Sequence, residues 1–280
     1  MFIALAAFPK STKQQRISHI DSLITLSEKA SFDVDLENTI IHAINALAQS
    51  QSIKYARGEI SASNLIGQAM FNSGNYKEAL RYFSVAENVK SKENFSLSLS
   101  QIYKTKGQIY FELGMSDRAV GIIKTALEKA SDIKNESNRN FVTSQIYEVM
   151  ANIYNDMGCI DSVNIYNDKN LALLTHMDDK FAYPLKINLY SLIASISHQH
   201  NDYDTANSYL SDAIKLIDQF DYTYLSNTYK IMGDTKLALH QPDSALQYLV
   251  RAEKNIAETG LTSELPELYQ SFSAVYEYMG

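Results

Sequence analysis

Small and large apolar residues recur along this chain at a spacing that repeats. From Gly67, the next marked residue is Gly74, seven positions on, and Ala79, Phe83 and Ala86 follow at intervals of five, four and three. Intervals of three and four place side chains on one face of a helix, so this pattern predicts amphipathic α-helices. Further copies read Gly107, Gly114, Ala119, Ile123, Ala126; Ala194, Asn201, Ala206, Leu210, Ala213; Gly233, His240, Ala245, Leu249, Ala252; and, more weakly, Ala151, Gly158, Val163, Asn167, Asn170.

Each position of this frame has a physical role in a pair of helices, which we name helix A and helix B in chain order. The first position, Gly67, lies on helix A and is small because two helices approach closely only where side chains are small. The second position, Gly74, follows helix A and favours the left-handed conformation that ends a helix. Phe83 lies one turn after an alanine of helix B and fills the space between neighbouring pairs.

The helix bounds follow from the frame and from the prolines. Pro184, Pro242 and Pro266 are all expected in the first turn of a helix, where a missing N–H is least costly. We predict helix A segments near 12–30, 57–73, 94–113, 137–157, 181–199, 221–239 and 263–279, and helix B segments near 35–51, 76–90, 116–132, 160–176, 203–219 and 242–258.

The repeated residues resemble the tetratricopeptide repeat. The match reads Ile66-Gly67 and Met70 on helix A, Gly74-Asn75-Tyr76 at the turn, and Ala79, Phe83 and Ala86 on helix B; it covers residues 57–280 and, loosely, 12–52. The resemblance implies an all-α fold, a right-handed α-solenoid of antiparallel helix pairs with about six and a half repeats. The anchors lie 40, 44, 43, 39 and 40 residues apart, against ~34 in the usual repeat. Longer helices of this kind are similar to those of bacterial regulators that contain this repeat.

The chain is predicted to contain two regions. Residues 1–11 are apolar and are interpreted either as the remnant of a secretory signal peptide or as a first turn packed on the array. Residues 12–280 are predicted to form the superhelix, with an incomplete last repeat, because Tyr269, Ser273 and Tyr276 reproduce the frame of helix A. We expect a longer protein to continue the array, and we expect self-association through the uncapped C-terminal helix. The compartment stays open, with an extracytoplasmic or membrane-anchored location slightly favoured.

Charge argues against nucleic acid as a partner of this segment. The formal net charge is −7, whereas phosphate binding needs clustered Lys and Arg. Residues 1–140 hold 17 basic and 14 acidic side chains, and residues 141–280 hold 8 and 18. The acidic second half is either a solvated surface or one that steers a cationic partner. We expect no membrane span, because no apolar run approaches the ~18 residues that a span needs.

No constellation has the spacing of a catalytic or metal site. His198 and His200, with Asp202, come nearest, but residues two apart point to opposite sides of a helix. Cys159, the single cysteine, follows the turn residue Gly158 and is interpreted as a packing residue rather than a nucleophile. We therefore expect no metal, no cofactor and no enzymatic activity. A metal-dependent enzyme that uses these histidines remains the third alternative.

Polar residues on the helix A segments, on the side away from helix B, are the best binding candidates. Asn and Gln present a donor and an acceptor together, so they can pair with the backbone of an extended peptide. Phe71 and Phe111 are expected to add apolar pockets, although a solvated wall would also be polar. The predicted peptide-binding residues are Asn64, Gln68, Phe71, Gln101, Lys104, Gln108, Phe111, Gln145, Glu148, Asn152, Asn155, Asn188, Ser191, Ser195, His198, Asn227, Lys230 and Asp234.

These features favour a non-catalytic scaffold that binds a protein or peptide, as the sensory or docking part of a larger bacterial regulator. The alternative is a structural scaffold that assembles complexes through its convex face or its open C-terminal end.

Overall fold

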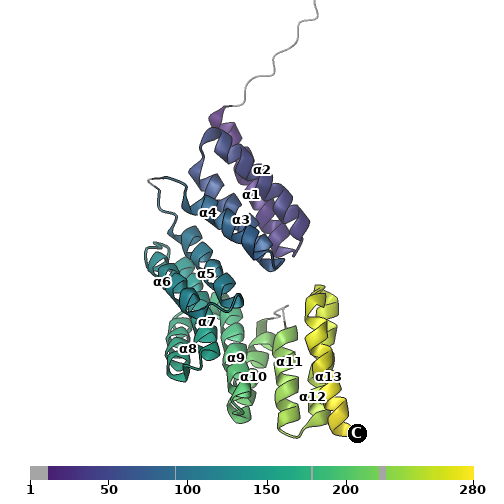
Figure 1. Cartoon of the computed structure of the whole chain (residues 1–280). Helices are drawn as coiled ribbons and strands as arrows, with labels where there is room; N and C mark the ends of the chain where they lie inside the picture. The colour runs from purple at the N-terminus through teal and green to yellow at the C-terminus, as the bar shows by residue number, and fades with distance from the viewer. Residues whose placement is uncertain (1–11, 92, 178, 221–224) are drawn as a thin grey trace, which may run out of the picture. The chain divides into compact units, whose positions relative to one another are not determined.

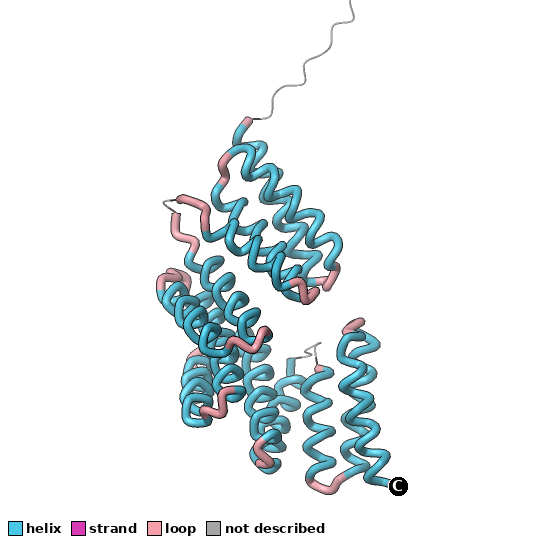
Figure 2. The backbone as a smooth tube through the Cα atoms, in the orientation of Figure 1, coloured by secondary structure: helices cyan, strands magenta, loops and turns pink. Residues whose placement is uncertain are grey.

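The computed structural model describes residues 12–91, 93–177, 179–220 and 225–280. Every regular element in these ranges is helical (Figure 2). The helices are α1 (Lys13–Phe32), α2 (Leu36–Ile53), α3 (Ala56–Asn72), α4 (Tyr76–Glu87), α5 (Ser96–Glu112), α6 (Ser116–Ser131), α7 (Glu136–Asp156), α8 (Ile160–Thr175), α9 (Asp179–Gln199), α10 (Tyr203–Phe220), α11 (Ser226–Ala238), α12 (Pro242–Thr259) and α13 (Leu265–Met279), with a 3-10 turn at Thr262–Glu264. The predicted succession of helices is confirmed, while the interpretation of residues 1–11 falls outside the described ranges.

One proline prediction is wrong. Pro242 and Pro266 stand in the first two positions of α12 and α13, as expected. Pro184 instead lies inside α9, because that helix already begins at Asp179 and not near residue 181. Its ring therefore removes one backbone hydrogen bond from the second turn of α9.

The turns between helix A and helix B share one backbone conformation. Gly74, Gly114 and Gly158 have φ angles of 73°, 70° and 69°, and Asn201 and His240 reach 62° and 60° at the equivalent positions. All five lie in the left-handed region, which glycine adopts without steric strain and asparagine with little strain. The predicted role of the second frame position is therefore confirmed, including the two copies without glycine.

The chain divides into two compact units, residues 1–142 and residues 143–280. In the first unit α1 packs with α2, α3 with α4 and α5 with α6; in the second, α9 packs with α10 and α11 with α12 (Figure 1). Helix A of one pair also contacts helix A of the next, as in α3 with α5, α9 with α11 and α11 with α13. Sequential antiparallel pairing of this kind defines an α-solenoid.

The first frame position marks the crossing of helix A and helix B. A Cβ atom at Gly67 would overlap the ring of Phe83, and one at Gly107 would overlap the side chain of Ile123. Phe83 and Ile123 are themselves fully buried. A glycine on one helix thus makes room for the largest buried side chain of the other, which fixes where the two helices cross.

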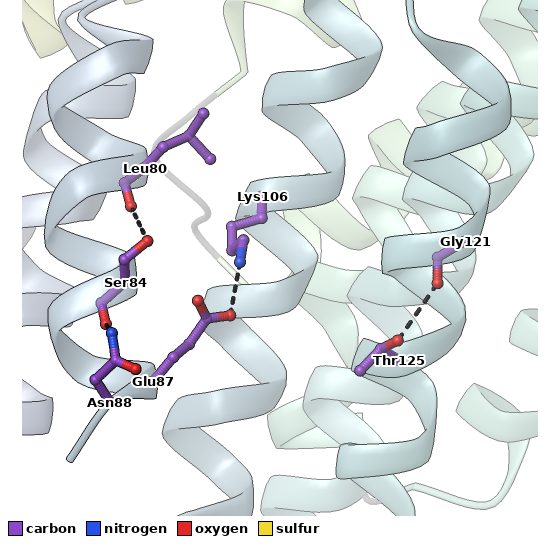
Figure 3. A network of polar contacts seen from close by, with 7 residues as sticks. All are labelled: Leu80, Ser84, Glu87, Asn88, Lys106, Gly121 and Thr125. Carbon is purple, nitrogen blue, oxygen red and sulfur yellow. Dashed lines mark hydrogen bonds and ion pairs between the residues drawn. The ribbon is translucent and has the colours of Figure 1, made fainter.

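An ion pair joins the second pair of helices to the third. The Lys106 side chain of α5 extends to the Glu87 carboxylate at the end of α4, with 2.6 Å between Nζ and Oε1 (Figure 3). Only 16% and 20% of the two side chains are exposed. The ammonium group also lies 5.1 Å from the centre of the Tyr103 ring. Limited solvent access makes this pair stronger than an ordinary surface ion pair.

We predict that Gly107→Ala destabilises the first unit by about 1–3 kcal/mol, because the new methyl group overpacks the crossing with Ile123. Urea unfolding followed by circular dichroism measures the change. The double variant Gly107→Ala with Ile123→Ala should recover part of the loss relative to the sum of the two single variants.

Gly121→Ala is the matched control for this prediction. Gly121 lies on the exposed side of α6, and a Cβ atom there meets nothing within 4 Å. This variant should be neutral or more stable by up to ~1 kcal/mol, since alanine favours helix more than glycine does. Equal destabilisation by both substitutions would contradict the close-crossing interpretation.

Candidate peptide-binding surface

The predicted binding residues lie on α3, α5, α7, α9 and α11, which are all helices A. Four equivalent positions, six residues before the anchor of each repeat, carry Gln101, Gln145, Asn188 and Asn227. We call the side of helix A that is expected to face away from helix B the inner row; on α5, α7, α9 and α11 it carries at least one carboxamide. The structure separates these residues into those that join successive helices A and those that line an open cavity.

In the first unit, carboxamides link α3 to α5. Gln68 Nε2 donates to Thr105 Oγ1 at 2.7 Å, and Asn64 Nδ2 donates to Gln101 Oε1 at 3.5 Å. Asn64, Gln68 and Gln101, which were all predicted, are half buried. Part of their hydrogen-bonding capacity is therefore used to hold neighbouring repeats together.

The two predicted apolar pockets have a different character. Phe71 is half buried, joins the core cluster around Phe83 and lies with its ring centre 5.9 Å from that of Tyr76. Phe111, at the end of α5, is also half buried. Phe71 is thus committed to packing, and the remaining predicted residues of this unit, Lys104 and Gln108, lie half buried on α5.

A polar cavity of about 340 Å³ lies within the second unit. Its lining residues are Glu148 and Asn152 of α7, Asn188, Ser191, Leu192 and Ser195 of α9, and Asn227, Thr228 and Ile231 of α11. Three successive helices A therefore build one concave site, and most of its lining residues are those predicted from the sequence.

Exposed carboxamides surround the opening of this cavity. Asn152, Asn188 and Asn227 are exposed, one on each of the three helices. Behind them, the hydroxyl groups of Ser191 and Thr228 share a buried hydrogen bond of 2.8 Å that ties α9 to α11. The exposed amides can thus turn toward a ligand while the wall behind them is fixed.

Other predicted residues of the same unit form polar contacts near the C-terminal end of α9 and within α11. Asn155 Nδ2 donates to Gln199 Oε1 at 2.9 Å, and the His200 ring lies 3.1 Å from Asn155 Oδ1. The His198 ring lies 3.2 Å from the Thr235 hydroxyl. Lys230 forms an ion pair with Asp234 at 3.2 Å, one turn away on α11.

The two histidines considered for metal binding contact different helices. His198 faces Thr235 on α11, whereas His200 faces Asn155 on α7. Asp202 accepts a hydrogen bond from the backbone N–H of Thr205 at the start of α10. Across the described residues, no three His, Cys, Asp or Glu side chains gather closely enough to hold a metal ion.

Sequence reasoning missed Thr105, Gln199, Thr228 and Thr235, which are hydrogen-bond partners of predicted residues. Each lies on helix A about one repeat away from the residue it contacts. A search for polar residues recurring near this separation would have found them, because helix A packs on the next helix A. The residues of the inner row therefore act in pairs across repeats.

The paired helices form a tetratricopeptide-like repeat fold. The structure is similar to pilF of Pseudomonas aeruginosa (TM-score 0.55, 16% identity, 92% of this chain and 98% of that one). It is also similar to BtubC of P. vanneervenii (0.52, 15%, 90% and 93%). A STAND signal-transduction ATPase with a tetratricopeptide repeat sensor from Pyrococcus horikoshii matches with a TM-score of 0.61 at 14% identity, over 95% of this chain and 44% of that one.

At these identities the likeness concerns the fold alone. No protein-family model and no curated protein sequence matches the chain. None of the described helices is both long and apolar enough to cross a membrane.

We predict that protonation of His198 destabilises the second unit. Burial lowers the pKa of His198 below its ordinary value of 6.5; Asp234 opposes this shift and Lys230 adds to it. The unfolded chain therefore binds a proton more readily, so the free energy of unfolding falls as the pH drops through about 6.5 and levels off below the folded-state pKa.

Unfolding experiments between about pH 8 and about pH 5 test this, with His198→Gln expected to flatten the pH dependence. His176→Gln is the control, because His176 is exposed at the end of α8. If His198→Gln leaves the pH dependence of the wild type unchanged, burial of this ring has no thermodynamic effect.

Proposed function

We propose that this chain is a non-catalytic scaffold that binds an extended segment of another protein in the cavity of its second unit. The observation that carries the proposal is the set of three exposed carboxamides, Asn152, Asn188 and Asn227, placed on three successive helices around one cavity. The described lining residues are amides, hydroxyls and apolar groups with a single carboxylate, Glu148. Such a surface suits binding better than chemistry.

Carboxamides match the peptide backbone in a specific way. Each Asn side chain offers two N–H donors and one carbonyl acceptor, as a peptide group offers one of each. Neighbouring helices lie ~10 Å apart, so three of them span ~20 Å, the length of about six extended residues. A ligand held through its backbone is accepted with little dependence on its sequence, which is useful in a docking surface.

The acidic excess of the second unit favours ligands with a positive charge. Residues 143–280 carry 18 acidic and 8 basic side chains. Such an excess attracts basic segments over distances of about a Debye length, ~8–10 Å at ordinary salt. The proposed ligand is therefore an extended peptide with a net positive charge.

The biological setting that we propose is the sensory or docking part of a larger bacterial regulator. Support comes from the long helices, of 16–21 residues in α5–α10, and from the likeness in fold to the repeat sensor of the STAND ATPase. In such an arrangement, a ligand in the cavity would contact the helices that the hydrogen bond between α9 and α11 joins, and it would stabilise their packing.

The alternative function is assembly through the C-terminal end of the array. The observation in its favour is α13, on which Tyr269, Tyr276 and Tyr278 are exposed by 52%, 57% and 51%. Tyr269 and Tyr276, two turns apart, share one side of α13, whereas Tyr278 lies on another side, with its hydroxyl 3.0 Å from the His240 ring. Exposed aromatic residues that share a side of a helix mark interaction surfaces. This surface is separate in the sequence from the residues that line the cavity.

We predict that Asn152→Ala with Asn188→Ala weakens peptide binding about tenfold, because two hydrogen bonds worth ~0.5–1.5 kcal/mol each are lost. The probes are peptides selected by the wild-type protein from a random library displayed on phage, then synthesised and measured by fluorescence anisotropy.

The matched control removes two other exposed carboxamides of the same unit, Asn164 on α8 and Gln219 on α10, by substitution with Ala. This control should bind as the wild type does. Unchanged affinity in the folded Asn152 and Asn188 variant would contradict the proposal that the peptide binds in this cavity.

A further inference from the structure

A second cavity of the second unit lies between α8, the end of α9 and the turn into α10. Its volume is about 160 Å³. Ile160 and Val163 of α8 and Ile193 and Ile196 of α9 are among its lining residues. Val163, Ile193 and Ile196 are buried, whereas Ile160 is exposed at 38%. None of the described residues that line this cavity also lines the one proposed to bind a peptide.

Asn167 is the unusual residue of this cavity. It stands at the position of helix B where the other copies of the frame carry Phe83, Ile123, Leu210 and Leu249, all of them fully buried. Asn167 lines the cavity and is only 8% exposed. Its Oδ1 atom is buried and accepts no hydrogen bond from the described residues. Burial of an unpaired carbonyl group costs free energy, so packing does not explain an asparagine at this position.

The short side chain of Ser197 makes room at the same place. On α5 and α11, the residue three positions after the anchor of helix A is Tyr110 or Lys236, each several atoms longer than serine. On α9 this residue is Ser197, and it lines the cavity together with Asn167. Two positions at which this repeat departs from its neighbours therefore meet at one cavity.

The charged and titratable residues of the cavity are engaged elsewhere. The His200 ring lies 3.1 Å from Asn155 Oδ1, and Asp202 accepts a hydrogen bond from the backbone N–H of Thr205. Both are exposed, whereas Asn167 is buried. An uncharged ligand suits the apolar walls best, and Asn167 is the buried group that it would have to satisfy.

The size of the cavity and the chemistry of its amide together define a ligand class. A cavity of ~150 Å³ is large enough to hold a benzene ring. The Asn167 amide can offer a donor or an acceptor, because a half-turn about its last side-chain bond exchanges Nδ2 and Oδ1. A phenolic hydroxyl likewise donates and accepts. An aliphatic group of the same size would leave the amide unpaired.

We propose that this cavity binds a phenol ring, supplied either by a small phenolic molecule or by a tyrosine side chain of a partner protein. The ring would lie among Val163, Ile193 and Ile196, and its hydroxyl would form a hydrogen bond with Asn167. We call this cavity the phenol site. The inference goes beyond the proposed function, and it does not depend on the cavity proposed to bind a peptide.

Titrations of the full chain with small probes test the ligand class. The probes are 4-methylphenol and N-acetyltyrosinamide, followed by shifts in the ¹H–¹⁵N spectrum of the protein. We expect saturable binding with a Kd of about 1 mM, which is usual for a ligand of so few atoms. Toluene and N-acetylphenylalaninamide, which lack the hydroxyl, should bind at least about fivefold more weakly.

The two phenol probes distinguish the two sources of the ring. Binding of 4-methylphenol alone supports a small phenolic ligand, since the backbone of the tyrosine derivative is then not accommodated. Binding of N-acetyltyrosinamide with equal or higher affinity supports a tyrosine side chain. The absence of saturable binding by both probes would overturn the proposal, and so would equal binding of each probe and its analogue without the hydroxyl.

Asn167→Leu separates a loss of binding from a loss of folding. The variant restores the residue that α10 and α12 carry at this position, fills part of the cavity and removes the unpaired amide. We expect phenol binding to weaken at least about tenfold, while the urea concentration at the midpoint of unfolding rises. Phenol binding by Asn167→Leu equal to that of the wild type would contradict the phenol site.

Asn207→Leu is the matched control. Asn207 Oδ1 on α10 is likewise buried without a partner among the described residues, but Asn207 does not line this cavity. This variant should bind phenols as the wild type does. Ser197→Tyr gives a second test should Asn167→Leu not fold, because it places a ring of the protein itself beside the cavity. It should weaken binding at least about tenfold, and unchanged binding would contradict the proposal.

Discussion

The close crossing of helix A and helix B is the constraint on which the rest of this structure depends. At Gly107 the backbone of α5 comes so near to α6 that only a hydrogen atom fits in front of Ile123. Ala119 and Ala126 are fully buried on either side of that contact. Small residues at the crossing bring two backbones together, and one large side chain fills the remaining space, so the angle and register of each pair are set locally.

Most of the fold was predictable because the residues that impose this constraint lie close together in the sequence. A small residue, a left-handed turn and an alanine-flanked large residue all fall within one helix pair, so the sequence alone places the helices within a few residues. Asn201 and His240 show that the turn depends on its position more than on glycine. Pro184 shows the limit, since the start of α9 is set by packing that the frame does not record.

The candidate site was less predictable because it depends on contacts between repeats. Projection of the frame identifies which side chains are expected on the inner row of helix A, and the structure places two of them, Asn152 and Asn188, at one cavity. It does not predict how far each helix A is rotated about its own axis relative to the helix A of the next repeat. Gln68 was predicted to face a ligand, yet its amide donates to Thr105 of the following repeat. Phe71 packs on Tyr76 within its own helix pair, a contact that the projection of helix A alone does not include.

The size of side chains on α9 explains why the cavity opens where it does. Its two central inner-row positions carry Ser191 and Ser195, both of which line the cavity. At the equivalent positions of the frame, α5 carries Lys104 and Gln108, which are long enough to occupy such a space themselves. Two short hydroxyl side chains therefore leave room between longer neighbours, and the amides on either side supply the polar groups. The same repeat that stabilises the array thus opens a polar cavity where two side chains are a few atoms shorter, without any change in the helices.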